Sequence, residues 1–251
     1  MSIKVRASSW GDLMAGATSA GLTEKQAEML ATLQAKEKRT DKQEETMNEL
    51  IAKRDAPFEL SKGAKTCVEK IIKQMVYGYS KSFSSKETLK GIAVEDESIL
   101  LYNEVFFTSH VKSESELECE FSKGHPDIED EINKKIIDIK SPWSKETFPV
   151  FAEDAKNSGY EWQVKMYLYM KGGTKTGWTQ GEIAYVLTDT PEELIPDWEP
   201  DDLHDMSNLP DRLRVTIVHV TLTEEDEKLI EQVGKAMQTY ADEYLTKINN
   251  K

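Results

Sequence analysis

The sequence predicts an α/β fold, in which a β-sheet is flanked by helices and preceded by a helical extension. The first 60 residues are polar and have helical character, and further helices follow up to about residue 105. From about residue 117, strand-like stretches appear with helical stretches between them. Because neither an internal repeat nor a low-complexity linker interrupts the chain, we expect a single domain over residues 1–251.

The composition is that of a folded protein with a polar surface. Its 251 residues are 38% hydrophobic and 31% charged, which is enough chain to bury a core. No stretch reaches the roughly 20 apolar residues that cross a bilayer, and no apolar signal-peptide segment follows the first residues. Cys67 and Cys119 are too few and too far apart for a disulfide scaffold or a four-cysteine metal cluster. We therefore expect a cytoplasmic protein with no membrane partner.

The net charge of −14 argues against a protein that coats DNA nonspecifically, because such proteins neutralise phosphates with Lys and Arg. It does not exclude a nuclease, since a locally basic groove can coexist with an acidic outer surface. Residues 189–205 carry eight acidic side chains and no Lys or Arg. We expect this segment to face away from a DNA backbone.

Two polar helices are predicted in the first 60 residues. Thr23 and Gln26 resemble a capping box that opens a helix through roughly Ala35. A second helix is predicted over about 41–53, ending before Pro57. Both mix charges of the two signs, so a solvated helical hairpin is favoured over a catalytic role.

Two more helices follow the hairpin. Ser61 is expected to cap the first, which ends near Gly78 and has apolar residues at helical spacing. The second is predicted to begin near Glu87 and to extend through Val105. Residues 117–121 then alternate apolar and polar side chains like a half-buried strand.

The remaining elements alternate between strands and helices. A turn-rich stretch over 122–126 precedes a second strand at 134–140, which Pro142 ends. Helices are predicted around 146–156 and 159–171, and further strands at 183–187 and 215–222. Thr223 is expected to cap a final amphipathic helix over 224–247.

Two aspartates and a lysine form the most informative pattern. Asp138 and Lys140 are two apart on the predicted strand and therefore project from one face, while Ile137 and Ile139 point to the other. Asp127 lies eleven positions before Asp138, and a hairpin would bring the two side by side. Neighbouring carboxylates repel unless a cation neutralises them, and oxygen ligands suit Mg²⁺ or Mn²⁺. An exposed ion pair beside a turn explains the same three residues equally well.

The pattern resembles the signature of the PD-(D/E)XK nuclease superfamily, in which a Pro-Asp and an Asp/Glu-x-Lys lie on adjacent strands. Pro126 with Asp127, and Asp138 with Lys140, supply these elements. Gly91 to Glu95 matches a Gly-x-x-x-Glu, and Gln163 to Tyr167 matches a Gln-x-x-x-Tyr, as in the branch of phage lambda exonuclease and the YqaJ-type viral recombinases. The match spans residues 90–171 with the four elements in the family's order.

The resemblance implies a restriction-endonuclease-like core, with a central mixed sheet flanked by helices. Its parts would be a helical extension at 1–60, a catalytic core at 87–222 and a C-terminal helix at 223–251. The resemblance also implies roles for single residues. Asp127, Asp138 and the Ile139 carbonyl would bind the metal, Mg²⁺ or Mn²⁺. Glu95 would bind this metal or a metal-bound water.

The remaining implied roles concern the attacking water and the substrate. Lys140 would orient or activate the water, while Gln163 would hold that lysine or a substrate phosphate, supported by Tyr167. Ser141 and Trp143 follow the lysine strand and would line the substrate path. Trp143 would either stack on an unpaired base or close the edge of the core.

A looser resemblance concerns the N-terminus. Arg6, Ser8 and Ser9 resemble the start of the first helix in lambda-type exonucleases, where a serine and an arginine receive a 5′-terminal phosphate. A simple helix cap is the favoured interpretation of these serines.

The family relationship implies a metal-dependent 5′-to-3′ exonuclease on double-stranded DNA, in phage recombination within an infected or lysogenic bacterium. The expected partners are DNA, a single-strand annealing protein and further copies in a ring, such as a trimer. Two alternatives stay open: an endonuclease of the same superfamily, and a non-catalytic DNA-binding, assembly or DNA-mimicking protein on this fold. The helices over 23–54 have no counterpart in the family pattern, and Asp138 replaces the glutamate common in this branch.

Overall fold

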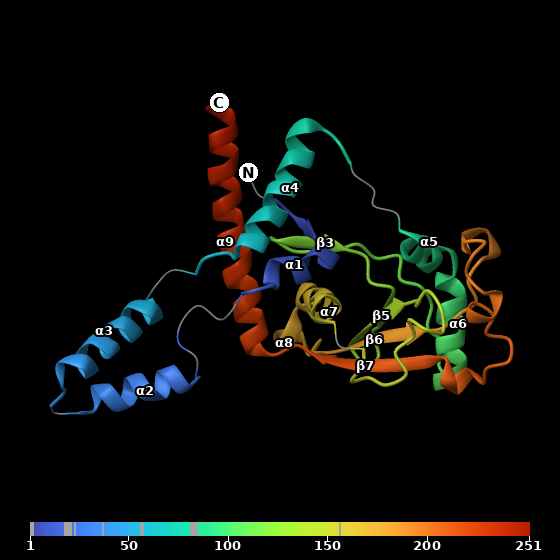
Figure 1. The fold of residues 1–251 in the computed structure, drawn as a ribbon, viewed down its shortest axis with the longest axis horizontal. Helices are drawn as coiled ribbons and strands as arrows, with labels where there is room; N and C mark the ends of the chain where they lie inside the picture. Colours follow the sequence, from blue (N-terminus) through green and yellow to red (C-terminus); the bar gives the residue numbers. More distant parts are fainter. Residues whose placement is uncertain are drawn as a thin grey trace.

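A computed structural model describes residues 3–17, 22, 24–36, 38–55, 58–80, 85–155 and 157–251. Helices surround two β-sheets, which confirms the predicted α/β class (Figure 1). Within these ranges, no helix combines the length and the apolar character needed to cross a membrane.

The larger sheet carries the predicted motif. Its strands lie in the order β4 (Ile128–Asp130), β5 (Lys135–Lys140), β6 (Gln180–Val186) and β7 (Val215–Thr221). Strands β5 and β6 are parallel and the other two pairs are antiparallel, so the sheet is mixed as expected. Ile128 pairs with Ile137, and this register places Asp127 opposite Asp138.

The smaller sheet corrects the prediction around residue 120. The expected strand at 117–121 is only two residues long, β2 (Leu117–Glu118). The expected turn at 122–126 begins with β3 (Ser122–Gly124), which lies between β2 and β1 (Val5–Arg6). Strand β3 exists because a segment more than 100 residues away pairs with it in parallel, a partner that local sequence does not reveal. The turn between β4 and β5 lies at 131–134.

Both faces of the larger sheet are covered. Helix α7 (Ser158–Met170) packs on one face and α6 (Glu95–Phe106) on the other. Along β5, Ile136 joins the core beneath α7, whereas Ile137 and Ile139 join the separate cluster beneath α6. The alternation predicted for this strand therefore sorts side chains between two buried layers.

The N-terminal residues belong partly to the core. The 3-10 helix η1 (Ala7–Ser9) and helix α1 (Trp10–Met14) pack against α7, and Trp10 is fully buried. Only α2 (Glu24–Gln34) and α3 (Asp41–Asp55) form the predicted hairpin, which projects from the body in Figure 1. A small cluster of Leu30, Leu33 and Leu50 holds the hairpin together. The predicted cap Thr23 lies outside the described residues.

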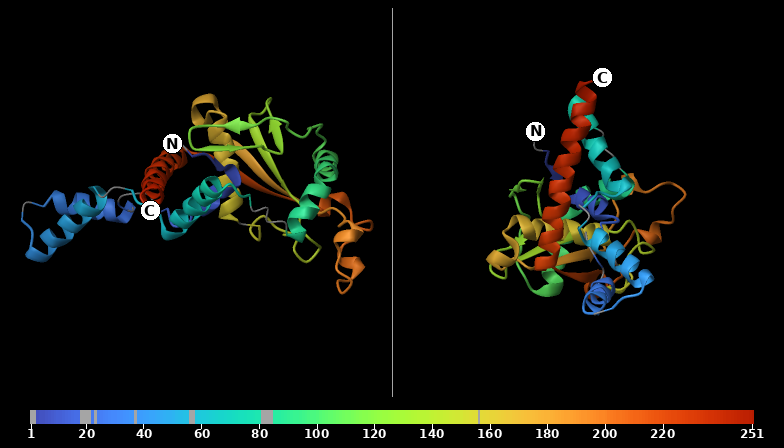
Figure 2. Two further views of the ribbon diagram at one scale, coloured as in Figure 1. Left: turned by 90° about the horizontal axis from the view of Figure 1, so that it is seen from above. Right: turned by 90° about the vertical axis from the view of Figure 1, so that its left-hand side faces the viewer.

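The next helices carry the predicted end signals. Ser61 accepts a hydrogen bond from Ala64 N at the start of α4 (Lys62–Tyr77), and Gly78 ends it in the left-handed conformation. Thr223 and Asp226 form a capping box on α9 (Glu224–Asn249). The two views in Figure 2 show α4 and α9 lying side by side.

Two helix predictions are wrong. The single helix expected over 87–105 is two, α5 (Lys86–Ala93) and α6, with a break at Val94 (φ −110°, ψ 13°). Three successive acids, residues 95–97, favour a new helix start there because they face the positive end of the helix dipole. Residues 146–155 form turns instead of a helix, because Pro149 lacks an N–H and restricts the residue before it. The end of that prediction, Lys156, lies outside the described residues.

The remaining elements are short. Helix α8 (Gly173–Thr176) follows α7. The segment between β6 and β7 contains three 3-10 helices, η2 (Glu192–Leu194), η3 (Asp201–Leu203) and η4 (Asp211–Leu213). Each begins directly after a proline.

Candidate active site

A cavity of about 510 Å³ opens where strand β5 ends. Strand β5 and the turn before β4 supply its charged floor, α7 supplies one wall, and α5 with the start of α6 supplies another. Eight of the predicted site residues line it: Glu95, Asp127, Asp138, Ile139, Lys140, Ser141, Trp143 and Gln163.

Asp138 lies at the centre of the floor and is 1% exposed. Its Oδ1 accepts a hydrogen bond from Gln163 Nε2 at 3.0 Å. Its Oδ2 lies 2.6 Å from Lys140 Nζ in an ion pair, but accepts no well-directed hydrogen bond from the described residues. A buried carboxylate oxygen in this position is suited to bind a cation.

Asp127 adds a second buried carboxylate. Its Oδ2 accepts a hydrogen bond from the main-chain N–H of Ile139 at 2.6 Å. Burial and the neighbouring charge of Asp138 raise the pKa of Asp127 well above that of an ordinary aspartate, although Lys140 opposes the shift. Two carboxylates share one lysine, so an additional cation would relieve their repulsion, and the residues present fit a hard divalent metal ion.

Lys140 is held as a cation. Burial alone would lower the pKa of its ammonium group, but the carboxylates of Asp138 and Asp127 outweigh that effect and raise the pKa. Its Nζ also lies 4.5 Å from the centre of the Tyr160 ring. In this arrangement, Lys140 can orient a water or a phosphate, but it is a poor proton acceptor.

Glu95 lies at the edge of the cavity, as the first residue of α6. Its carboxylate forms an ion pair with Lys112, and its charge also acts on Asp127. Among the residues that the structure describes, no group of three or more His, Cys, Asp or Glu side chains is arranged to hold a metal ion. The floor therefore offers a pair of carboxylates, with Glu95 engaged elsewhere.

Gln163 and Tyr167 share one face of α7, as predicted, and Gln163 Nε2 donates to the Tyr167 hydroxyl at 3.5 Å, which is consistent with the supporting role expected of Tyr167. Gln163 binds the Asp138 carboxylate and not the lysine. The Tyr167 hydroxyl donates to the main-chain oxygen of His125 at 2.9 Å, and burial raises its pKa to about 12. Tyr167 thereby fixes α7 to the segment that carries Asp127.

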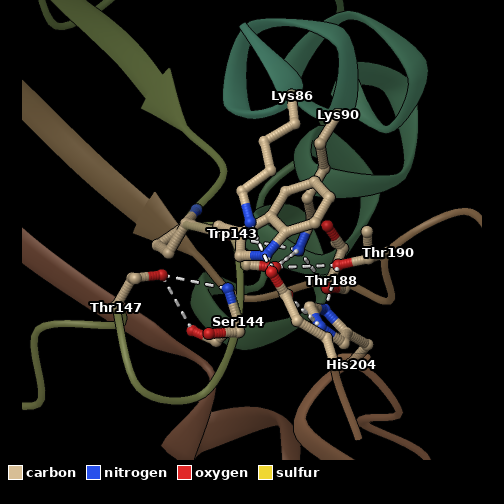
Figure 3. A network of polar contacts seen from close by, with 10 residues as sticks. Lys86, Lys90, Trp143, Ser144, Thr147, Thr188, Thr190 and His204 are labelled. Atoms are coloured by element: carbon tan, nitrogen blue, oxygen red, sulfur yellow. Dashed lines mark hydrogen bonds and ion pairs between the residues drawn. The ribbon is translucent and has the colours of Figure 1, made fainter. Parts of the chain in front are cut away.

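The residues after β5 form the wall beside the lysine. The Ser141 hydroxyl lies 3.0 Å from the Ser98 hydroxyl on α6. Trp143 is 5% exposed, and its indole N–H donates to Glu199. The Lys86 ammonium lies 4.3 Å from the centre of the Trp143 ring (Figure 3). This burial favours the alternative in which Trp143 closes the edge of the core.

Arg6, Ser8 and Ser9 do not line this cavity. Arg6 and Ser8 are exposed, and Ser9 precedes α1 without forming a side-chain cap hydrogen bond, so the favoured cap role is not observed. A β-carbon added to Gly11 in α1 would lie 2.4 Å from the Gly159 Cα, so α1 crosses the start of α7 at close range. The three residues thus lie beside the α7 wall and not on the floor.

Sequence reasoning missed Tyr160, Tyr185 and Lys90. Tyr160 precedes Gln163 by three positions, so helical spacing alone would have placed it on the same face. Tyr185 lies opposite Lys140 across the parallel β5–β6 pair, which required knowledge of the strand order. The buried contacts of Lys90 depend on two segments distant in sequence, at Pro142–Trp143 and at Thr188.

The acidic stretch at 189–205 lies beyond Trp143. Glu199 from this stretch binds both Trp143 and Lys86, and His204 is buried against Glu199 and Thr190. The stretch therefore supports the outer side of the α5 wall.

Comparison with solved structures finds the same fold in known exonucleases. A phage-related exonuclease from Haemophilus somnus 129PT superposes with a TM-score of 0.76 at 24% identity, over 99% of this chain and 97% of that one. An alkaline exonuclease from Laribacter hongkongensis superposes with a TM-score of 0.53 at 12% identity, over 76% of this chain and 84% of that one. Its complex with dAMP gives a TM-score of 0.51 at 14% identity, over 98% and 90%. No protein-family model and no curated protein matches the chain.

Proposed function

We propose that this protein is a metal-dependent deoxyribonuclease, with the Asp127–Asp138 pair and Lys140 as its catalytic centre. One observation supports this proposal most: the Oδ2 atom of Asp138 is buried and accepts no hydrogen bond from the described residues, and Asp138 lines a cavity with one lysine and a second buried carboxylate. The fold shared with exonucleases supports this choice among the chemistries that two carboxylates allow.

Mg²⁺ or Mn²⁺ is the proposed cofactor, because both prefer oxygen ligands. Asp127 and Asp138 would hold it, with Glu95 available if its pairing with Lys112 is released. Bound there, the metal would lower the pKa of a water and offset the charge that develops on a phosphate.

The protein's own residues would position the reacting groups. The Ile139 N–H fixes one Asp127 oxygen, and Gln163 fixes one Asp138 oxygen, which leaves the remaining oxygens for the cavity. Lys140, held as a cation over Tyr160, would orient the attacking water or a phosphate oxygen. Attack of this water on phosphorus, in line with the scissile bond, would form one P–O bond and break the other. The water would give up a proton and the leaving oxygen would take one up, both by exchange with solvent.

Three finer assignments rest on the family resemblance alone. They are digestion from 5′ to 3′ on double-stranded DNA in phage recombination, a ring-shaped homo-oligomer such as a trimer, and a single-strand annealing protein as partner. Arg6, Ser8 and Ser9 would then belong to the DNA path along α7, outside the cavity floor. An endonuclease of the same fold is the second candidate, because a floor of two carboxylates and a lysine fits either mode of attack.

A cleavage assay with linear and circular duplex DNA tests the proposal. Linear 5′-phosphorylated duplex should be degraded with Mg²⁺ or Mn²⁺ and left intact with EDTA, whereas a closed circle should be spared. Lys140→Ala and Asp138→Ala should each reduce cleavage at least about 100-fold while DNA binding persists. Lys171→Ala is the matched control, since Lys171 is a similarly shielded, ion-paired lysine outside the cavity.

Each outcome of this assay separates two hypotheses. Cutting of the closed circle would favour the endonuclease. Intact linear DNA with every metal would favour the non-catalytic alternative. Undiminished cleavage by Lys140→Ala and Asp138→Ala would place the reaction elsewhere on the protein.

A further inference from the structure

Lys90 on α5 is a lysine with 0% exposure. Its Nζ donates three hydrogen bonds, to the main-chain oxygens of Pro142 (2.7 Å), Trp143 (3.1 Å) and Thr188 (2.9 Å). Figure 3 shows the ammonium group reaching from α5 into the space beneath the Trp143 ring.

Burial of the Lys90 ammonium group costs folding free energy, so its presence here indicates a specific role. An ammonium group removed from water is strongly destabilising unless its donors are satisfied, and here the partners are neutral carbonyls. An apolar side chain of similar length would fill the same space without that cost, although the main-chain oxygens of Pro142 and Thr188 would lose this donor and that of Trp143 would keep only Thr190. The lysine therefore contributes directed links between segments beyond simple packing.

The segments that Lys90 joins are the walls of the catalytic cavity. Pro142 and Trp143 directly follow the strand that carries Lys140, and Thr188 follows the end of β6. On the helix side, Gly91 and Ile92 are the immediate neighbours of Lys90, and both line the cavity. The three hydrogen bonds thus set the separation between the α5 wall and the strand ends at the floor.

A second layer of contacts fixes the same tryptophan. The main-chain oxygen of Trp143 accepts a hydrogen bond from Lys90 and a second one, at 2.8 Å, from the Thr190 hydroxyl. His204 binds Thr190 and Glu199, and Glu199 in turn binds the Trp143 indole N–H and Lys86. Lys90 supplies the inner attachment of this network and the acidic stretch supplies the outer one (Figure 3).

We propose that Lys90 is a positioning residue of the nuclease centre, which fixes helix α5 and the Pro142–Trp143 segment at the spacing needed to hold a DNA strand against Lys140. This inference rests on the proposed function, because it assigns a role within that reaction. Lys90 does not line the cavity and acts only through the main chain around it.

Because the Lys90 ammonium group can lose a proton, the proposal predicts that activity depends on pH. Burial lowers the pKa of Lys90 to about 8, although the charges of Asp189 and Glu97 oppose the shift. A neutral amine has two N–H groups for three carbonyl acceptors, so one link is lost when the proton leaves. The other titratable groups around it are Lys86 and Glu87 on its own helix, and Glu199 and His204 of the outer layer.

As pH rises and Lys90 loses its proton, we expect the stability of the fold to increase and the cleavage activity to decrease. The pKa of Lys90 is lower in the folded protein than the ordinary lysine value of 10.5, so between pH 8 and pH 10.5 the unfolded chain binds more protons. The contribution of Lys90 to stability therefore increases with pH across that window. A decline in activity through about pH 8 would then reflect the lost link and not unfolding.

The experiment compares Lys90→Met, Lys90→Arg and Lys165→Met with the unaltered protein. Lys165 is the matched control, because it is also buried at 8% exposure but is ion-paired with Glu161 and Asp226 outside the cavity. For each variant, kcat, KM and the melting temperature are measured from pH 6 to pH 10 on linear duplex DNA.

We expect Lys90→Met to lower kcat/KM about 10- to 100-fold, as small misplacements of catalytic groups do, with Lys165→Met within about twofold of the unaltered protein. The unaltered protein should lose activity through about pH 8 without a matching fall in melting temperature. Lys90→Arg should recover part of the activity and abolish this alkaline decline, because a guanidinium group stays protonated.

Equal kinetics for Lys90→Met and Lys165→Met would overturn the inference. If Lys90→Met does not fold, an alkaline decline that is identical in Lys90→Arg and the unaltered protein overturns it instead. Failure of the proposed function is distinguishable, since the unaltered protein would then cleave no DNA at any pH.

Discussion

At the scale of single residues, the candidate centre depends on carboxylates that stabilise the folded chain poorly on their own. Burial and the charge of Asp138 raise the pKa of Asp127, which means that its ionised form is disfavoured in the folded state. Asp130, on the neighbouring strand β4, is the opposite case. Burial alone would raise the pKa of Asp130, but hydrogen bonds from Asn133 and Ile132 outweigh the effect of burial and lower the pKa.

Because the pKa values of Asp127 and Asp130 are shifted in opposite directions, Asp127→Asn and Asp130→Asn should change the melting temperature in opposite directions. Because the pKa of Asp127 is higher in the folded than in the unfolded chain, its contribution to stability falls as pH rises through the folded value. Asp127→Asn should therefore raise the melting temperature of the metal-free protein at pH 8, by about 2–4 °C per kcal/mol gained, and should have a smaller effect at pH 5, where the folded carboxyl is still protonated. Asp130→Asn should lower it at pH 8, because its depressed pKa contributes stability above the unfolded value.

Thermal melts with and without Mg²⁺ or Mn²⁺ measure this. The metal should raise the melting temperature of the unaltered protein, but not that of Asp127→Asn, since the variant lacks a proposed ligand. A loss of stability at pH 8 in Asp127→Asn as large as that in Asp130→Asn would contradict the interpretation of Asp127.

At the scale of elements, α7 brings the site together. It supplies Gln163 and Tyr160 to the cavity and anchors Tyr167 beside Asp127. Two glycines allow its close packing. A β-carbon on Gly181 of β6 would lie 2.4 Å from Val164 Cγ1, and one on Gly11 would lie 2.4 Å from the Gly159 Cα. The Gly11 contact involves backbone on both sides, so no side chain can move to relieve it.

Gly11→Ala should therefore displace α1 from α7 and destabilise the protein. We expect a cost of about 1–3 kcal/mol, typical of overpacking, with reduced cleavage because the start of α7 carries Tyr160. Gly63→Ala is the control, since an added β-carbon there meets only the Ser61 hydroxyl at 3.8 Å. Circular dichroism melts and the linear-duplex assay measure both effects, and equal melting temperatures for the two variants would contradict the close-approach argument.

Element prediction succeeded where the local chemistry was sufficient. Ser61, Gly78 and Thr223 mark helix ends by side-chain or backbone properties that operate within four residues. It failed for β3, whose parallel partner is β1, and for residues 146–155, where the effect of Pro149 was underestimated.

At the scale of the whole molecule, the α2–α3 hairpin is separable from the body. Its three buried leucines pack on one another, and the hairpin projects away from both sheets (Figure 1). The chain segments on either side of it are tied together, because the Ser61 hydroxyl donates to the Ala15 oxygen at 2.7 Å. Ala17 and Phe58 also pack against the main core on the two sides.

Replacement of residues 22–55 by a short Gly/Ser linker should therefore leave the body folded. We expect the melting temperature to change by less than about 3 °C, and cleavage of linear duplex to persist, because the cavity contains no hairpin residue. A fall in activity at unchanged stability would instead assign the hairpin a role in holding DNA or another copy of the chain. Light scattering on the same samples distinguishes these two roles.

The sequence alone placed Asp138 and Lys140 on one strand face, with Asp127 within hairpin distance, and its resemblance to a nuclease pattern selected these residues over an exposed ion pair. It determined the order of most elements through capping and periodicity, which act over a few residues. The tertiary structure decided that Gln163 binds Asp138, that Glu95 turns to Lys112, and that Lys90 is buried beneath Trp143. These contacts join residues that lie 17 to 53 positions apart in the sequence. At such separations, burial and competing partners decide which contacts form, and local sequence does not.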